Sequence, residues 1–172
     1  MKKALAVLTL FTAAFPTTAF SQSQDFIRDT IVSRLKNSRD FTLKVADAMP
    51  AADYEFKLTK PQMSFARQMA HIGESMDYFM SVFSGEKPNP SKPSSMSKTD
   101  VMAYVKAQYD KTIESASKLT SEQIDKTYKG GEGGSMNGLA DLIAMLEHAA
   151  HHRASAEMYL RAKGITPPSY MD

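Results

Sequence analysis

The strongest helix signal of the chain lies in residues 136–163, which read MNGLADLIAMLEHAAHHRASAEMYLRAK. Apolar residues recur along this stretch at steps of three and four, which is the spacing of an α-helix. Few positions are left for a polar face, so we expect much of this helix to be buried. Gly164 and then Pro167 and Pro168 follow it, and both residue types end helices.

Three further stretches carry the same periodicity and predict helices over residues 25–48, 61–83 and 97–119. Pro61 is a suitable first-turn residue for the second helix, and Ser97 is a suitable N-cap for the third. The sequence shows no internal repeat and no alternating strand pattern. Four helices of this length in a chain of 172 residues predict an all-α fold, a four-helix bundle.

The predicted connections differ in composition. Residues 85–96 are rich in proline and serine and predict a surface crossover between the second and third helices. Residues 120–123, Thr-Ser-Glu-Gln, have the spacing of a capping box and predict one short helical turn. Residues 129–135 are rich in glycine and predict a loop, but they lack the residues of a phosphate-binding loop.

Residues 1–21 have the three parts of a secretory signal peptide. Residues 1–3, Met-Lys-Lys, are a short basic start, residues 4–15 are mostly apolar, and small residues lead to Ser21, after which we expect cleavage. The apolar run is shorter than the about 20 residues of a membrane-spanning helix, so a retained anchor is the weaker alternative. We therefore expect an exported protein, periplasmic or secreted, with a single domain over residues 22–172 and no stable membrane anchor.

Removal of that segment changes the charge balance. Its only charged residues are Lys2 and Lys3, so the mature chain keeps 21 − 2 = 19 basic residues against 19 acidic ones. No basic stripe interleaved with aromatic residues is present, so we do not expect nucleic-acid binding. The sequence has no cysteine, which leaves histidine, aspartate and glutamate as metal ligands and excludes a cysteine nucleophile.

Three of the four histidines lie within residues 148–152. On a helix His148 and His152 project almost the same way, one turn apart, which suits two imidazoles binding one ion, whereas His151 is rotated away. His71 shares the register of the apolar stripe of the second predicted helix, so we expect it to point inward. Two inward histidines on one helix and one on another predict a three-nitrogen metal site in a bundle core.

Other interpretations of these residues stay open. His71 alone would more often be an ordinary hydrogen-bonded core residue. Glu74 or Asp141 as a fourth ligand would close the site and favour a structural role for the metal. Arg153 and Glu157 have the spacing of a helical ion pair. A bundle that works by protein interaction without metal would need an accessible apolar face.

Three segments of the chain resemble those of a known family. Residues 69–74, Met-Ala-His-Ile-Gly-Glu, are similar to its segment on the second helix. Residues 147–153, Glu-His-Ala-Ala-His-His-Arg, resemble its His-x-x-His-His-Arg motif on the fourth helix. Residues 159–168, Tyr-Leu-Arg-Ala-Lys-Gly-Ile-Thr-Pro-Pro, resemble its C-terminal segment. Over essentially the whole mature chain, the sequence resembles the DinB-like (YfiT-like) superfamily of metal-dependent bundle proteins.

The resemblance implies a bundle with a crossover between helices two and three, often assembled as a homodimer. It implies metal ligation by His148 and His152, with His71 as the third ligand. One departure is visible: the family usually has Gly-Gln after the motif, where Ala154 and Ser155 stand in this chain. The amide that the family carries at that position is therefore absent.

Three neutral imidazoles leave other positions of a bound ion open, which is typical of catalytic sites. We expect a divalent metal ion, zinc first, with nickel, iron and copper as ions that imidazole also suits. The predicted activity is that of a metal-dependent hydrolase or transferase on a small-molecule substrate, and the sequence names neither the substrate nor a catalytic residue. Related enzymes use thiols of the reducing cytoplasm, so thiol transfer is less expected for an exported protein. The competing interpretation is a non-catalytic, exported metal-binding or metal-stabilised bundle.

Overall fold

The structure, a computed structural model, describes residues 18–129 and 134–170, with side chains described from Asp25 onward. Four long helices make up the fold: α1 Thr18–Ala48, α2 Phe65–Ser84, α3 Lys98–Ser117 and α5 Gly138–Ala162. Shorter elements lie between them: the 3-10 helix η1 Ala51–Asp53, the helix α4 Ser121–Asp125, and the strands β1 Thr127–Lys129 and β2 Ser135–Asn137.

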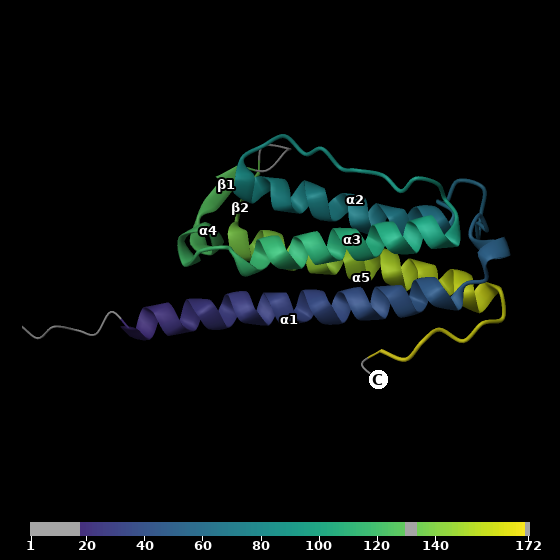
Figure 1. Cartoon of the computed structure of the whole chain (residues 1–172), viewed down its shortest axis with the longest axis horizontal. Helices are drawn as coiled ribbons and strands as arrows, with labels where there is room; N and C mark the ends of the chain where they lie inside the picture. Colours follow the sequence, from purple (N-terminus) through teal and green to yellow (C-terminus); the bar gives the residue numbers. More distant parts are fainter. Residues whose placement is uncertain (1–17, 130–133, 171–172) are drawn as a thin grey trace, which may run out of the picture.

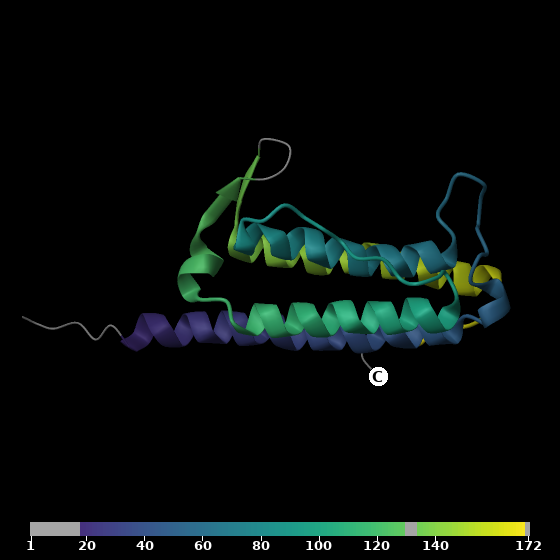
Figure 2. The same cartoon turned by 45° about the horizontal axis from the view of Figure 1, so that its top comes forward.

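The four long helices lie side by side, as Figure 1 and Figure 2 show. α2 packs against α3 and α5, and α1 packs against the same two helices, so α1 and α2 lie at opposite corners of the bundle. α2 and α3 run in the same direction, and the residues between them return along the length of the bundle (Figure 1). The predicted four-helix bundle and its crossover are confirmed.

The core lies where the apolar stripes of the long helices meet. Its fully buried side chains come from all four helices: Leu35, Val45, Phe65, Met69, Ile72, Val105, Tyr109, Leu142 and Met145. Each such side chain stabilises the fold by about 1.5–3 kcal/mol. Gly73 permits the close approach of α2 and α3, because a Cβ atom there would lie 2.7 Å from Cε1 of Tyr104. This contact helps to set how α2, which carries His71, sits in the bundle.

Capping side chains, and not prolines, mark where α2 and α3 begin. α2 begins at Phe65 and not at Pro61, because the side chain of Ser64 caps its first turn and Pro61 lies in the turn before it. The predicted N-cap of α3 is confirmed, since Oγ of Ser97 accepts a hydrogen bond from the Asp100 amide at 3.2 Å.

The region before α5 contains one predicted element and one that was not predicted. The capping box at residues 120–123 is confirmed and opens α4. β1 and β2 form a short antiparallel hairpin. Strands of three residues are too short to show an alternating pattern in the sequence. The side chain of Asn137, at the end of β2, caps α5, which therefore begins at Gly138 and not at Met136. Most of the predicted glycine-rich loop, residues 130–133, lies outside the described residues.

Most of the predicted signal peptide, residues 1–17, lies outside the described residues. α1 begins at Thr18, inside the predicted leader, and cleavage after Ser21 stays a prediction. Among the helices that the structure describes, none combines the length and the apolar character that crossing a bilayer requires.

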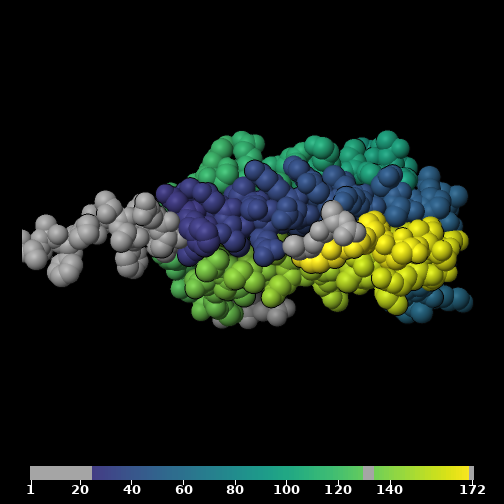
Figure 3. Space-filling view, turned by 90° about the horizontal axis from the view of Figure 1, so that it is seen from below, coloured from purple at the N-terminus to yellow at the C-terminus, as the bar shows by residue number. Residues whose placement is uncertain are grey.

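The C-terminal end of α5 follows the sequence prediction. Gly164 ends the helix with a φ of 74°, a left-handed conformation that glycine adopts at low cost. The tail that follows lies against α1 (Figure 3). The ring of Tyr170 in this tail contacts that of Phe41 edge-on, with the centroids 5.3 Å apart.

Candidate metal centre

The packing of α2 against α5 brings three histidines together. His71 comes from α2, and His148 and His152 come from α5, one turn apart. One ring nitrogen of each lies within 4.8 Å of one from each of the others, and all three residues are partly buried. The ring centroids of His71 and His152 are 4.5 Å apart, those of His148 and His152 are 4.6 Å apart, and those of His71 and His148 are 5.2 Å apart. We call these three residues the histidine cluster.

The fourth histidine, His151, lies outside the cluster. Its side chain is exposed, although its ring centroid is 5.0 Å from that of His152. This agrees with the helical spacing, which rotates His151 away from its two neighbours in the motif. His151 is therefore a matched control residue for the cluster, with the same chemistry on the same helix.

A buried amide from α2 fixes the orientation of one ring of the cluster. Oε1 of Gln68 lies 2.6 Å from Nδ1 of His152, and Gln68 is only 8% exposed. Because an amide oxygen accepts and does not donate, Nδ1 carries the proton and Nε2 keeps its lone pair free. Contacts of this kind orient the histidine ligands of metal sites. Gln68 was not predicted from the sequence, where its one signal is that it precedes His71 by three positions on the same helix.

Gln68 also bears on the departure from the family pattern. Ser155, which stands where the family usually has an amide, donates its hydroxyl to the carbonyl of His151 at 3.1 Å. It therefore turns back onto its own helix. The amide beside the cluster comes from α2 instead.

Two nitrogen atoms of the cluster have no protein partner. Nδ1 of His71 and Nε2 of His148 are buried and make no hydrogen bond with the described residues. A buried polar atom without a partner costs about 1–3 kcal/mol, so such atoms call for an explanation. Imidazole nitrogens are common ligands of zinc and of neighbouring transition metals. The residues present therefore fit a bound metal ion.

Burial keeps two of the three rings neutral. It is the main cause that lowers the pKa of His148 below the ordinary value of 6.5, with smaller effects of His71 and His151. Burial also lowers the pKa of His152 to about 4, followed by smaller effects of the other histidines and of Arg67. Near pH 7 these side chains are thus in the unprotonated form that binds metal.

Neither carboxylate that might close the site joins the cluster. Oε2 of Glu74 accepts a hydrogen bond from Nη2 of Arg67 at 2.7 Å and lies 3.7 Å from Nδ1 of His71. Asp141 is buried earlier on α5, where burial raises its pKa to about 6 and Oδ2 has no partner among the described residues. Within the described part of the chain, imidazoles alone make up the cluster.

Arg153, the last residue of the histidine motif, points away from the cluster. The ion pair with Glu157 that its spacing left open does not form among the described residues, and Arg161 approaches that carboxylate instead, at 3.7 Å. Nη1 of Arg153 donates to Ser38 at 3.0 Å and to Thr42 at 3.2 Å, both on α1. The spacing of an ion pair is not sufficient when one partner is buried against another helix.

Comparison with known proteins agrees with the resemblance of these segments. The sequence profile of the DinB family matches residues 20–171. The chain belongs to the DinB family. The resemblance predicted from the three sequence segments is therefore confirmed.

Relatives of this DinB-family chain share its architecture. Uncharacterized protein YjoA of Bacillus subtilis is 27% identical over 139 residues, which cover 79% of this chain and 90% of that protein. The crystal structure of YjoA, a DinB-like protein, matches with a TM-score of 0.69 and covers 82% of this chain and 96% of its own. A DinB-like protein from Bacillus cereus matches with a TM-score of 0.71 at 17% identity, over 82% of this chain and 95% of that one. At that identity the likeness shows the fold alone.

Proposed function

We propose that this protein holds one divalent metal ion between His71, His148 and His152 and acts as a metal-dependent hydrolase or transferase. The observation that carries the proposal is the convergence of three imidazoles whose nitrogens lie within 4.8 Å of one another. Three protein ligands without a closing carboxylate are typical of catalytic metal sites. In such a site the ion supplies Lewis acidity toward water or a substrate oxygen.

The residues around the cluster support this proposal. Gln68 holds His152 in the tautomer that leaves Nε2 free. The side chain of His71 is 27% exposed, which gives a small-molecule substrate access to the rings. Arg67 lies near enough to lower the pKa of His152 and thus places a positive charge beside the site. Nη1 of Arg67 is buried and makes no hydrogen bond with the described residues.

Zinc is the ion that we expect first. Imidazole is a borderline ligand that suits zinc, and it also suits nickel, iron and copper, so availability in the cell contributes to the choice. Because the chain has no cysteine, a thiolate site that would select a softer ion is excluded.

A non-catalytic, metal-stabilised bundle is the second candidate, and one observation favours it. Two cavities, of about 480 and 600 Å³, are lined by other residues, so neither adjoins the histidine cluster. Cobalt substitution separates the two candidates. An open site predicts that azide changes the visible absorption spectrum of the Co²⁺ protein, whereas a spectrum that azide leaves unchanged would support the metal-stabilised bundle.

Elemental analysis of untagged protein tests the metal site itself. We expect about one equivalent of metal in the wild type and in the His151→Ala variant, and less than a tenth of that in His152→Ala. The His151→Ala variant removes an imidazole from the same helix but leaves all three rings of the cluster in place. Equal metal content in the two variants would contradict the proposed ligand set. Circular dichroism of each variant checks that the bundle has formed.

Export and assembly form a separate part of the proposal. Residues 1–21 direct export, and the mature protein works in the periplasm or outside the cell as a homodimer. Sedimentation of the mature chain should give twice its mass, and the mass of a single chain would contradict the homodimer. Support for export comes from the basic, apolar and small-residue pattern of the N-terminus and from a family match that begins at residue 20. Mass spectrometry of protein from a periplasmic extract should find a chain that begins at Gln22. A full-length chain confined to the cytoplasm would contradict export.

A further inference from the structure

A cavity of about 480 Å³ lies between α1, α5 and the C-terminal tail. Its walls include Phe41 from α1, Leu146 and Ala150 from α5, and Tyr170 from the tail. Arg153 also lines it. On α5, Ala150 and Arg153 project roughly 140° or more away from His148. The cavity is therefore separate from the histidine cluster and lies on the opposite side of the same helix.

Arg153 is a buried cation that has no counter-charge among the residues that the structure describes. Arg153 is only 7% exposed, and none of the described carboxylates forms an ion pair with it. Buried charges are normally paired, because removing an ion from water is costly. Two hydroxyl groups on α1 and the face of the Phe41 ring, 4.9 Å from the guanidinium carbon, offset part of this cost. These groups carry no negative charge.

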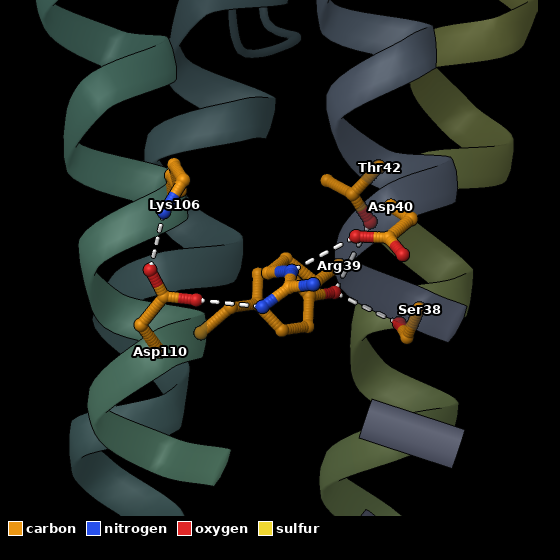
Figure 4. Close-up of polar contacts among 7 residues, drawn as sticks. Ser38, Arg39, Asp40, Thr42, Lys106 and Asp110 are labelled. Carbon is orange, nitrogen blue, oxygen red and sulfur yellow. Dashed lines mark hydrogen bonds and ion pairs between the residues drawn. The ribbon is translucent and has the colours of Figure 1, made fainter. Parts of the chain in front are cut away.

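The position of Arg153 is fixed by a polar network that crosses the bundle. Ser38 and Thr42, which both accept from its Nη1, also contact the hydroxyl of Tyr109 on α3, at 2.8 and 3.1 Å. Figure 4 shows Ser38 and Thr42 on α1 next to the Arg39–Asp110 ion pair, which ties α1 to α3. The guanidinium is thus held in place before any ligand arrives, which reduces the entropy that binding would cost.

Arg153 lines the cavity and keeps donors that no described residue occupies. All of its hydrogen bonds to described residues use Nη1, which leaves Nε and Nη2 without a partner among those residues. A guanidinium with donors free on one side matches the paired oxygens of a carboxylate.

We propose that this cavity binds a small organic acid, with its carboxylate on Arg153 and its apolar body against Phe41, Leu146 and Ala150. The volume lies within the range of about 300–1,000 Å³ that is usual for small-molecule sites. Arg34 adds an exposed positive charge at the rim. Lys44 and Asp40 also line the cavity, and Asp40 pairs with Arg39 at 2.9 Å. The apolar walls, which inorganic phosphate would leave without a partner, favour an organic acid.

Calorimetric titration of the full chain with phenylacetate tests this site. We expect saturable binding of phenylacetate and at least tenfold weaker binding of phenylacetamide, its uncharged analogue, and of inorganic phosphate. Arg153→Lys keeps a charge but loses the planar fork, so phenylacetate should bind at least tenfold more weakly. Arg161→Lys, the same substitution at an exposed arginine of α5 that does not line the cavity, should leave the affinity within twofold. Equal binding of phenylacetate and phenylacetamide would overturn the proposal.

Two further variants separate loss of the site from loss of the fold and an external ligand from the protein's own carboxylates. Ala150→Phe fills the cavity without touching the polar network, so loss of binding in a variant that melts like the wild type supports the site even if Arg153→Lys folds poorly. A variant with Asp172→Asn and a glycine–serine extension after residue 172 removes one carboxylate and moves the terminal one away, and so separates an external acid from the protein's own carboxylates. Equal affinity of the full chain and this variant supports an external ligand, whereas binding by the variant alone would overturn it.

Discussion

The side of α5 that faces α2 and the side that faces α1 both carry nitrogen-containing side chains that are removed from water. Burial changes the charge of these side chains on the first side only. Toward α2, burial lowers the pKa of His148 and His152, so their rings are neutral near pH 7. Toward α1, Arg153 is also buried, but a guanidinium side chain stays charged in proteins. Burial therefore keeps the imidazoles on one side of the helix neutral, whereas the guanidinium on the other side remains positively charged.

This difference indicates how one helix can offer sites for ligands of opposite sign. Neutral imidazoles present lone pairs, which attract a metal cation. A fixed guanidinium presents donors and a positive charge, which attract a carboxylate. In both places a neighbouring helix orients the group, through Gln68 of α2 for His152 and through Ser38 and Thr42 of α1 for Arg153.

Metal removal should have the largest effect on the side that faces α2. Binding to the folded state alone contributes about 4 kcal/mol when free metal is a thousand times the dissociation constant, which corresponds to roughly 10 °C in melting temperature for a domain of this size. Calorimetric melts of metal-loaded protein with and without EDTA measure the shift. The His152→Ala variant should show no shift, and a wild type that melts equally with and without EDTA would contradict a bound metal.

Substitution of Gln68 should have the next largest effect. Gln68→Leu removes the acceptor for the Nδ1 proton of His152, so we expect metal affinity to fall by about 10- to 100-fold, as for other outer contacts of metal sites. Gln68→Glu keeps an acceptor oxygen and should retain most of the affinity. Competition with a chromophoric chelator measures both. An unchanged affinity of Gln68→Leu would show that this contact does not orient the ring.

The pH dependence of the metal-free protein should separate the two sides of α5. The pKa of His152 is about 4 in the folded chain, below the ordinary value of 6.5 that applies after unfolding. Between these values the unfolded chain binds more protons, so stability should fall as the pH drops from 6.5 toward 4. Urea unfolding at several pH values measures the slope. His152→Gln should reduce it, whereas Arg153→Met should not, because it leaves all three imidazoles of the cluster in place. A slope that His152→Gln leaves unchanged would argue against a neutral, buried ring.

Asp141 offers a third, smaller test on the same helix. Burial raises its pKa to about 6, so the folded chain binds a proton that the unfolded chain releases above about pH 4. The free energy of unfolding should therefore decrease as the pH rises from about 4 to about 6, because Asp141 must lose its proton in the folded chain. We expect Asp141→Asn to stabilise the protein by about 1 kcal/mol at pH 7.5, with little change at pH 3.5 and with unchanged metal content. Loss of metal in this variant would show that Asp141 belongs to the metal site after all.

The parts of this protein that could be predicted from the sequence are those with local signals. Helical periodicity and the capping residue Ser97 predicted the long helices, and the spacing of His148 and His152 placed two rings on one side of a helix. Gln68 and the partners of Arg153 could not be predicted in this way. Their contacts depend on how α2 and α1 are rotated against α5, which no spacing within a single helix determines.

Anomalous diffraction at the zinc absorption edge, from crystals of zinc-loaded protein, would examine the histidine cluster itself. We predict a single strong peak within about 2.0–2.2 Å of one nitrogen from each of His71, His148 and His152. A peak too far from His71 for a metal–nitrogen bond, or the absence of a peak between α2 and α5, would contradict the proposed metal centre.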